Sequence, residues 1–180
     1  MKAMKIIGSG GLLALLAATL LTACGNSANN PPVAKPEIDP VHGHLTHAQP
    51  RLQTLKVWLG SEEMIAELAL KPVEIATGMM FRTNMAENEA MLFVFDGPGP
   101  KNFYMRNCTV PLSAAYIQPD GTIAEIVDLQ PGDETGVQSR TSNLQFVLEV
   151  PQGWFQRHNV NTGAVVRTER GSLLETFFRR

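Results

Sequence analysis

The chain has 180 residues, of which 44% are hydrophobic, and its 15 basic and 17 acidic residues give a formal net charge of −2 at pH 7. This length suits one folded domain with a core of ordinary size. A nucleic-acid partner would require a basic surface, so the weakly acidic balance argues against one.

The first 23 residues have the layout of a secretory signal peptide. Lys2 and Lys5 provide a positive start, and the following residues 6–23 carry no charge and are rich in leucine and alanine. This order of a charged and then an apolar region is typical of export signals. A retained membrane-spanning helix is the alternative, because the apolar stretch is near the lower length limit for such a helix.

The apolar stretch ends in "LTAC", residues 21–24, which resembles the lipobox of bacterial lipoproteins. The resemblance implies that the Cys24 thiol is lipidated, that the chain is cut before it, and that acyl chains such as palmitate form a durable membrane anchor. Gly25 stands where an aspartate would resemble an inner-membrane retention signal, so an outer-membrane location facing the periplasm is expected. With Cys24 lipidated, Cys108 has no cysteine partner for an internal disulfide.

Residues 24–50 are predicted to be a lipidated, proline-rich, disordered tether. Residues 25–50 contain five prolines and few bulky apolar residues, and such a composition does not bury enough surface to offset chain entropy. Three histidines lie close together here, and they are candidates for loose copper, nickel or zinc binding: His42, His44 and His47. No carboxylate or cysteine nearby is expected to complete a site. We therefore expect the three histidines to be solvated residues of the tether, and neither a metal nor a cofactor is predicted.

Residues 51–170 are predicted to form a single domain that begins with a β-hairpin. Alternating apolar residues indicate a strand over 54–60, and the run 64–70 pairs back onto it. Pro72 begins a helical segment over 72–82, because proline suits an early helical position. The apolar run 90–95 is typical of a strand that is buried on both faces.

The second half of the domain is predicted to consist mainly of strands, and residues 171–180 are predicted to be a C-terminal tail. The expected fold class is α+β, with mainly antiparallel strands in a curled sheet or partial barrel and one or two short helices. Residues 130–140 are expected to be a polar surface loop, and a tight turn is expected at 118–121. Strands are expected over 102–105, 112–117, 122–129, 144–150 and 163–168, with a brief helix over 153–159.

Five blocks follow one another in the order and spacing of one family: "GMMFR" (78–82), "MLFVF" (91–95), "FYMRNCTVPLSAAYI" (103–117), "PDG" (119–121) and "VLEVPQGWFQRHNVNTGAVV" (147–166). Over about residues 55–167 the chain resembles the domain-of-unknown-function 192 (DUF192) family. The resemblance implies no reaction, because no activity is established for that family. The chain departs from the family pattern at four positions: Tyr104 replaces tryptophan, Arg106 lysine, Cys108 threonine and Ser113 aspartate. Because a serine cannot act as a carboxylate, any acid or base role of that last position is lost here.

Arg82, Tyr104, Arg106 and Asn107 are the candidate ligand-binding residues. Guanidinium groups bind carboxylate or phosphate in a bidentate manner, so two arginines in one pocket would favour a small anionic ligand. Solvated charges are the alternative for Arg82 and Arg106. Asn107 is expected to organise a turn by bonding the backbone of a neighbouring loop, and Cys108 is expected to be a buried, inert thiol.

We therefore expect an uncharacterised lipid-anchored envelope protein that acts as an accessory module and binds a small ligand or an envelope protein. The sequence lacks a nucleophile elbow, a phosphate loop, a dinucleotide fingerprint and a zinc-protease motif. Catalytic residues are therefore unknown. The alternative is an enzyme of unknown reaction that uses a pocket around Arg82, Arg106 and Asn107.

Overall fold

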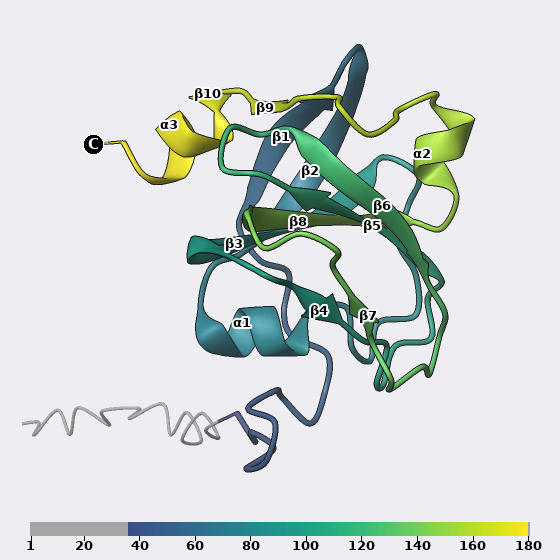
Figure 1. Cartoon of the computed structure of the whole chain (residues 1–180). Helices are drawn as coiled ribbons and strands as arrows, with labels where there is room; N and C mark the ends of the chain where they lie inside the picture. Colours follow the sequence, from purple (N-terminus) through teal and green to yellow (C-terminus); the bar gives the residue numbers. More distant parts are fainter. Residues whose placement is uncertain (1–35, 180) are drawn as a thin grey trace, which may run out of the picture. The chain divides into compact units, whose positions relative to one another are not determined.

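A mixed sheet of eight strands forms the framework of residues 36–179, which are the residues that the computed structural model describes (Figure 1). The strand order is β10-β9-β1-β2-β3-β8-β5-β6, and only the β2–β3 pair is parallel. The bounds are β1 Thr54–Leu59, β2 Glu62–Ala69, β3 Glu89–Gly99, β5 Leu112–Ile117, β6 Ile123–Leu129, β8 Leu144–Pro151, β9 Val166–Thr168 and β10 Gly171–Ser172. A separate two-stranded sheet pairs β4, Asn102–Phe103, with β7, Val137–Gln138. The predicted hairpin over β1 and β2 is confirmed.

The predicted signal peptide, residues 1–23, and the predicted lipidation of Cys24 lie outside the described residues, as does the predicted tether up to residue 35. Within residues 36–179, no helix is long and apolar enough to cross a membrane. Three short helices occur in this part of the chain: α1 Pro72–Thr77, α2 Trp154–Arg157 and α3 Leu173–Phe177.

The large sheet curls but does not close into a barrel, which confirms the predicted α+β fold with mainly antiparallel strands. Backbone hydrogen bonds join the turn between β5 and β6 to the residues that enter β9. Ile123 N–H donates to Ala164 O at 2.8 Å, and Val166 N–H donates to Gly121 O at 2.9 Å. A Cβ atom at residue 121 would lie 2.8 Å from Val166 O, so this close approach requires glycine.

Both faces of the sheet are buried, because side chains alternate between two apolar clusters along the central strands. Leu92 and Leu148 belong to the first cluster, which α2 and α3 cover, whereas Phe93 and Val147 belong to the second. Figure 1 shows α1 and the β4–β7 pair on the side of the sheet opposite α2 and α3. The prediction that residues 90–95 form a strand buried on both faces is confirmed.

Helix α1 is shorter than the predicted segment 72–82, because it ends where Gly78 takes a positive φ of 47°. A Cβ atom at residue 78 would lie 3.2 Å from the ring of Phe93, so glycine allows the chain to turn against the sheet. The residues after this turn, Met79 and Met80, are buried in the second cluster. Methionine suits such an irregular space because its side chain is flexible.

The folded unit extends beyond residue 170, where the sequence analysis placed the end of the domain. Ser172 begins α3 in a capping box, in which its hydroxyl accepts a hydrogen bond from Glu175 N–H and Glu175 bonds back to Ser172 N–H. Leu173 is completely buried in the first cluster. The S-x-x-E pattern over 172–175 was a readable sign of this helix start.

Residues 36–50 also pack on the domain, whereas the sequence analysis placed them in a disordered tether. Leu45 is buried, and its N–H donates to the Thr77 hydroxyl at 3.0 Å. The buried Gln49 amide donates to Gly78 O at 2.8 Å and to Glu74 O at 3.2 Å. The bond to Gly78 O satisfies a carbonyl group just after α1, where a helix leaves carbonyl groups without internal partners. Polar contacts therefore hold residues 36–50 on the domain, although the low apolar content of this segment predicted disorder.

We predict that Leu45→Ala lowers the free energy of unfolding by about 2 kcal/mol, because it removes a buried leucine side chain. Val41→Ala is the matched control, since Val41 is 78% exposed and its loss is expected to cost within about 0.5 kcal/mol. Urea denaturation of the two variants measures both effects. Equal stabilities for both variants and the parent would show that residues 36–50 do not pack in solution.

Candidate ligand-binding site

A cavity of about 190 Å³ lies within the second cluster, between the end of α1 and the strands β3, β4 and β8. Its wall is mainly apolar and includes aromatic and thioether side chains, among them Phe93, Phe103, Met79 and Met80. Polar groups are few, and the most unusual of them is the carboxyl group of Glu149. A small apolar cavity with few polar groups is the usual form of a ligand site.

Edge-to-face aromatic contacts hold the wall of the cavity in place. The ring centroids of Phe93 and Phe103 lie 5.0 Å apart at an interplanar angle of 86°, and those of Phe103 and Tyr116 lie 6.1 Å apart. The Tyr116 hydroxyl donates to Val137 O at 2.6 Å, which ties β5 to β7. Such perpendicular ring pairs are favourable beyond their buried area, so the wall is preformed.

Glu149 is buried in the middle of the sheet with no partner for its charge. It lies on β8 opposite Met91 of β3 and Ala114 of β5, neither of which offers a side-chain donor. Among the described residues, no hydrogen-bond partner reaches its Oε2 atom. Burial raises the pKa of Glu149 to about 8, so the carboxyl group is mainly protonated at neutral pH.

Cys108 lines the same cavity as a protonated thiol. Burial, and secondarily the nearby charge of Glu149, raises the pKa of Cys108 to about 12. A thiolate is the reactive form of cysteine, so this environment opposes a nucleophilic role. The prediction that Cys108 is buried is confirmed.

The four candidate ligand-binding residues do not converge on one site. Tyr104 lines the cavity, and the Arg106 guanidinium lies over its ring at 5.7 Å from the centroid. Asn107 is exposed and occupies a turn with a φ of 55°, which asparagine tolerates better than most residues. Its main-chain carbonyl accepts a hydrogen bond from Phe81 N–H at 2.8 Å, so the backbone rather than the side-chain amide holds the turn.

Arg82 forms a buried ion pair that has a structural role. Its Nη1 and Nη2 atoms lie 2.6 and 2.9 Å from the two carboxylate oxygens of Glu67, which also accepts bonds from Arg51 and Leu52 N–H. Burial alone would raise the pKa of Glu67, but the bonds from Arg82, Leu52 and Arg51 outweigh burial and lower that pKa. Removing one partner from such a buried pair is strongly destabilising.

Arg106 has a different acidic partner. Its Nε and Nη2 atoms donate to the same oxygen of Glu134 at 3.0 and 2.7 Å, and its Nη1 lies against Nε2 of His42. Arg82 and Arg106 therefore do not share an anion-binding pocket in the part of the chain that the structure describes. The two-arginine pocket that the sequence suggested is absent there.

Ser113, which stands where the family pattern has an aspartate, is a buried structural residue. Its hydroxyl donates to Asp128 Oδ1 across the β5–β6 pair and accepts a bond from Gly153 N–H at 2.8 Å. The serine thus connects the sheet to the turn before α2. Ser113 does not line the cavity, although its neighbour Ala114 pairs with Glu149.

Sequence reasoning missed Glu149. A readable signal was a single carboxylate inside an otherwise apolar strand, "LQFVLEV", residues 144–150. In a strand that is buried on both faces, such a residue has no exposed face to occupy, and a buried charge without a partner is rare.

The comparisons with known proteins show the family. The family model DUF192, described as an uncharacterized ACR, matches residues 56–168, so the chain belongs to this family. A search of curated proteins found no match.

Two solved structures have a similar fold. One is titled a "putative transcription regulator" from Sinorhizobium meliloti 1021, with 30% identity, a TM-score of 0.63, and coverage of 67% of this chain and 98% of that one. The other is a protein of unknown function from Novosphingobium aromaticivorans DSM 12444, with 31% identity, a TM-score of 0.60, and coverage of 75% and 94%. The similarity thus spans nearly the whole length of both relatives.

We predict that Glu149 makes stability fall as the pH rises. Its carboxyl group has an ordinary pKa of 4.5 and a folded-state pKa of about 8, so the folded state holds a proton that the unfolded state has lost. Between these values the free energy of unfolding decreases by up to about 1.4 kcal/mol per pH unit. Glu149→Gln should remove this decrease, as measured by urea denaturation between about pH 5 and 8.

The control for this experiment is Glu63→Gln, because the Glu63 side chain is 44% exposed. Its pH profile should run parallel to that of the parent. Parallel profiles for Glu149→Gln and the parent would instead show that Glu149 is ionised or paired in the folded protein.

Proposed function

We propose that this domain binds a small, mainly apolar ligand that carries one hydrogen-bonding group. The observation that supports the proposal is the buried, unpartnered carboxyl group of Glu149 in a mainly apolar cavity with several aromatic side chains. Buried polar groups in native proteins nearly always have partners, and an exception requires a reason. A ligand that bonds to Glu149 supplies that reason.

The energetics favour a ligand over an empty cavity. A buried polar group that lacks a hydrogen bond costs about 1–3 kcal/mol of stability. A ligand that places a hydroxyl, amide or carbonyl group against Glu149 recovers this energy, and its apolar part contacts Phe93, Phe103 and Met79. The same interactions would give the site its specificity.

The cavity favours a neutral ligand over the small anion that the sequence suggested. Its lining contains no arginine or lysine, and the guanidinium groups of Arg82 and Arg106 are paired with Glu67 and Glu134. A protonated carboxyl group both donates and accepts hydrogen bonds, so it complements a neutral polar group. An anion would find no positive charge in this wall.

A matched pair of probes, benzyl alcohol and toluene, tests the proposal. We expect benzyl alcohol to bind about fivefold more tightly than toluene, since one net hydrogen bond contributes about 1 kcal/mol. Glu149→Leu should abolish this preference, whereas Glu149→Gln should keep it because an amide also forms hydrogen bonds. NMR titration of the parent and both variants measures the affinities.

Failure of both probes to bind the parent would contradict a ligand cavity of this kind. A preference for benzyl alcohol that survives in Glu149→Leu would show that another group provides the polar contact. The denaturation midpoints of the variants, recorded at the same pH, confirm that each remains folded during the titration.

An enzyme is the second candidate, because a carboxyl group with a pKa of about 8 is suited to general acid–base chemistry near neutral pH. The observation against it is the neighbouring thiol. Cys108 is the other titratable group of the inner wall apart from Tyr104, and its raised pKa makes it a poor nucleophile. Arg82 and Arg106 are each engaged by an acidic residue, so a binding module agrees better with the site.

We also propose that the chain is a lipoprotein of the cell envelope, anchored through Cys24 to the outer membrane and facing the periplasm. The support is the sequence "LTAC" at residues 21–24 after an uncharged, leucine-rich stretch. In this setting the domain would present its cavity to a periplasmic ligand or to another envelope protein. Membrane attachment would come from the acyl chains.

Cys24→Ala tests the anchor, with Cys108→Ala as the control that removes the other cysteine. We expect the parent and Cys108→Ala to incorporate labelled palmitate and to fractionate with membranes, whereas Cys24→Ala should do neither. The physical reason is that thioether attachment of lipid requires the thiol of residue 24. A Cys24→Ala protein that still reaches the outer membrane at mature size would contradict the proposal.

A further inference from the structure

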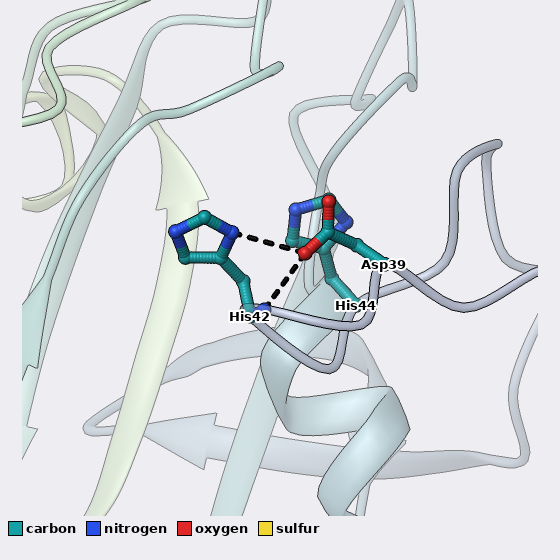
Figure 2. Close-up of side chains that lie close together, drawn as sticks. All are labelled: Asp39, His42 and His44. Carbon is teal, nitrogen blue, oxygen red and sulfur yellow. Dashed lines mark hydrogen bonds and ion pairs between the residues drawn. The ribbon is translucent and has the colours of Figure 1, made fainter.

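A second polar cluster lies outside the cavity, in the turn between residues 39 and 44. One ligand atom each from Asp39, His42 and His44 lies within 4.8 Å of the other two. Figure 2 shows these three side chains close together at the turn. The turn is closed by two backbone bonds, from Asp39 N–H to His44 O at 2.8 Å and from Gly43 N–H to Asp39 O at 2.9 Å. Residues that are three and five positions apart are thereby brought together.

His44 is oriented as a metal ligand would be. Its Nδ1 atom lies 2.8 Å from Leu45 O, and because a carbonyl only accepts hydrogen bonds, Nδ1 carries the proton. The lone pair is then on Nε2, which has no hydrogen-bond partner among residues 36–179. Metal-binding histidines commonly donate their other N–H to a backbone carbonyl in this way, which fixes both the tautomer and the ring orientation.

Asp39 offers a carboxylate held by the same turn. Its Oδ1 atom accepts a bond from Val41 N–H at 2.9 Å. The same oxygen accepts bonds from His42 N–H at 2.7 Å and from His42 Nδ1 at 3.0 Å, which are the dashed lines in Figure 2. The bond from the His42 backbone is the main reason that the pKa of Asp39 lies below its ordinary value. The second oxygen, Oδ2, has no hydrogen-bond partner within the described residues.

We propose that Asp39, His42 and His44 form a binding site for a divalent transition-metal ion such as Zn²⁺. Two imidazoles and one carboxylate form a ligand set that suits this ion, with ligand distances of about 2.0–2.2 Å. Ligand atoms around a tetrahedral ion lie about 3.4 Å apart, so a cluster within 4.8 Å needs only side-chain rotation to close on an ion. Three protein ligands leave a fourth position for water or another ligand.

The structure changes the metal candidates that the sequence suggested. His47 is exposed and does not belong to the cluster, whereas Asp39 supplies the carboxylate that the sequence analysis did not identify. Asp39 lies before the histidine-rich stretch, and only the turn geometry brings it to His42. The site is therefore more specific than a flexible run of histidines.

Arg106 lies beside the site, and its Nη1 atom donates to Nε2 of His42. Glu134 balances the positive charge of Arg106 through two bonds to its guanidinium group. A metal ion on Nδ1 of His42 shifts the ring proton from Nδ1 to Nε2, so the contact with Arg106 opens while the pair with Glu134 remains.

Zn²⁺ titration of the purified, metal-free chain by calorimetry tests the site, and Co²⁺ provides a spectroscopic probe of the same ligands. We expect one ion per chain, with visible Co²⁺ absorption bands that Zn²⁺ abolishes. His42→Ala removes a direct ligand, and Asp39→Asn replaces an anionic oxygen ligand by a neutral amide oxygen. Each should weaken the affinity by at least about tenfold, because loss of even an outer-shell partner commonly costs that much. His47→Ala is the matched control and should bind like the parent.

Asp39→Asn keeps the experiment decisive, because its amide oxygen still accepts the turn hydrogen bonds while its charge is lost. His42 is an exposed residue, so its replacement by alanine is not expected to unfold the domain. The proposal is overturned if the parent binds no Zn²⁺, if both variants bind it like the parent, or if His47→Ala weakens binding as much as His42→Ala does.

Discussion

Strand β8 sets the chemistry of the domain, because it lies between β3 and β5 and both of its faces are buried. Its side chains alternate with a period of two, so the placement of Phe146, Leu148 and Val150 in the first cluster forces Glu149 toward the second. A shift of register by one residue would move Glu149 into the first cluster, which is also buried, and would move the whole apolar set to the opposite face. The buried acid is thus a consequence of the sheet register, and the aromatic cavity forms around it.

The domain contains two buried glutamates whose environments shift their pKa values in opposite directions. Glu67 on β2 is bonded by Arg82, Arg51 and a backbone N–H, and these bonds lower its pKa despite burial. Glu149 has no such partner, and burial raises its pKa. A buried carboxylate with guanidinium partners joins segments of the fold, whereas a buried carboxyl group without a partner is available to a ligand. Arg82 and Arg106, which the sequence analysis named as candidate ligand-binding residues, are therefore engaged in ion pairs. The candidate ligand-binding residue is instead Glu149.

Apolar patterns predicted most of the sheet: alternation indicated β1 of the hairpin over β1 and β2, and a continuous apolar run indicated the buried strand β3. The sequence analysis also predicted the buried Cys108, because no activating base was found for it, and it named Tyr104, which lines the cavity, as a candidate residue. Composition indicated disorder for residues 36–50, because the contacts that hold this segment are mainly polar bonds to α1. The composition of residues 36–50 gives no information about those partners, because they lie about thirty residues away in the sequence.

The sequence by itself determined the family, the strand pattern and the residue types with reactive side chains, since these depend on local order and spacing. Only the tertiary structure decided which of these side chains meet. Arg82 pairs with Glu67 rather than with an anion, Asp39 rather than His47 joins His42 and His44, and Glu149 faces a cavity. The physical reason is that pairing, burial and protonation depend on the neighbours that each side chain acquires from distant segments, and strand periodicity does not specify those neighbours.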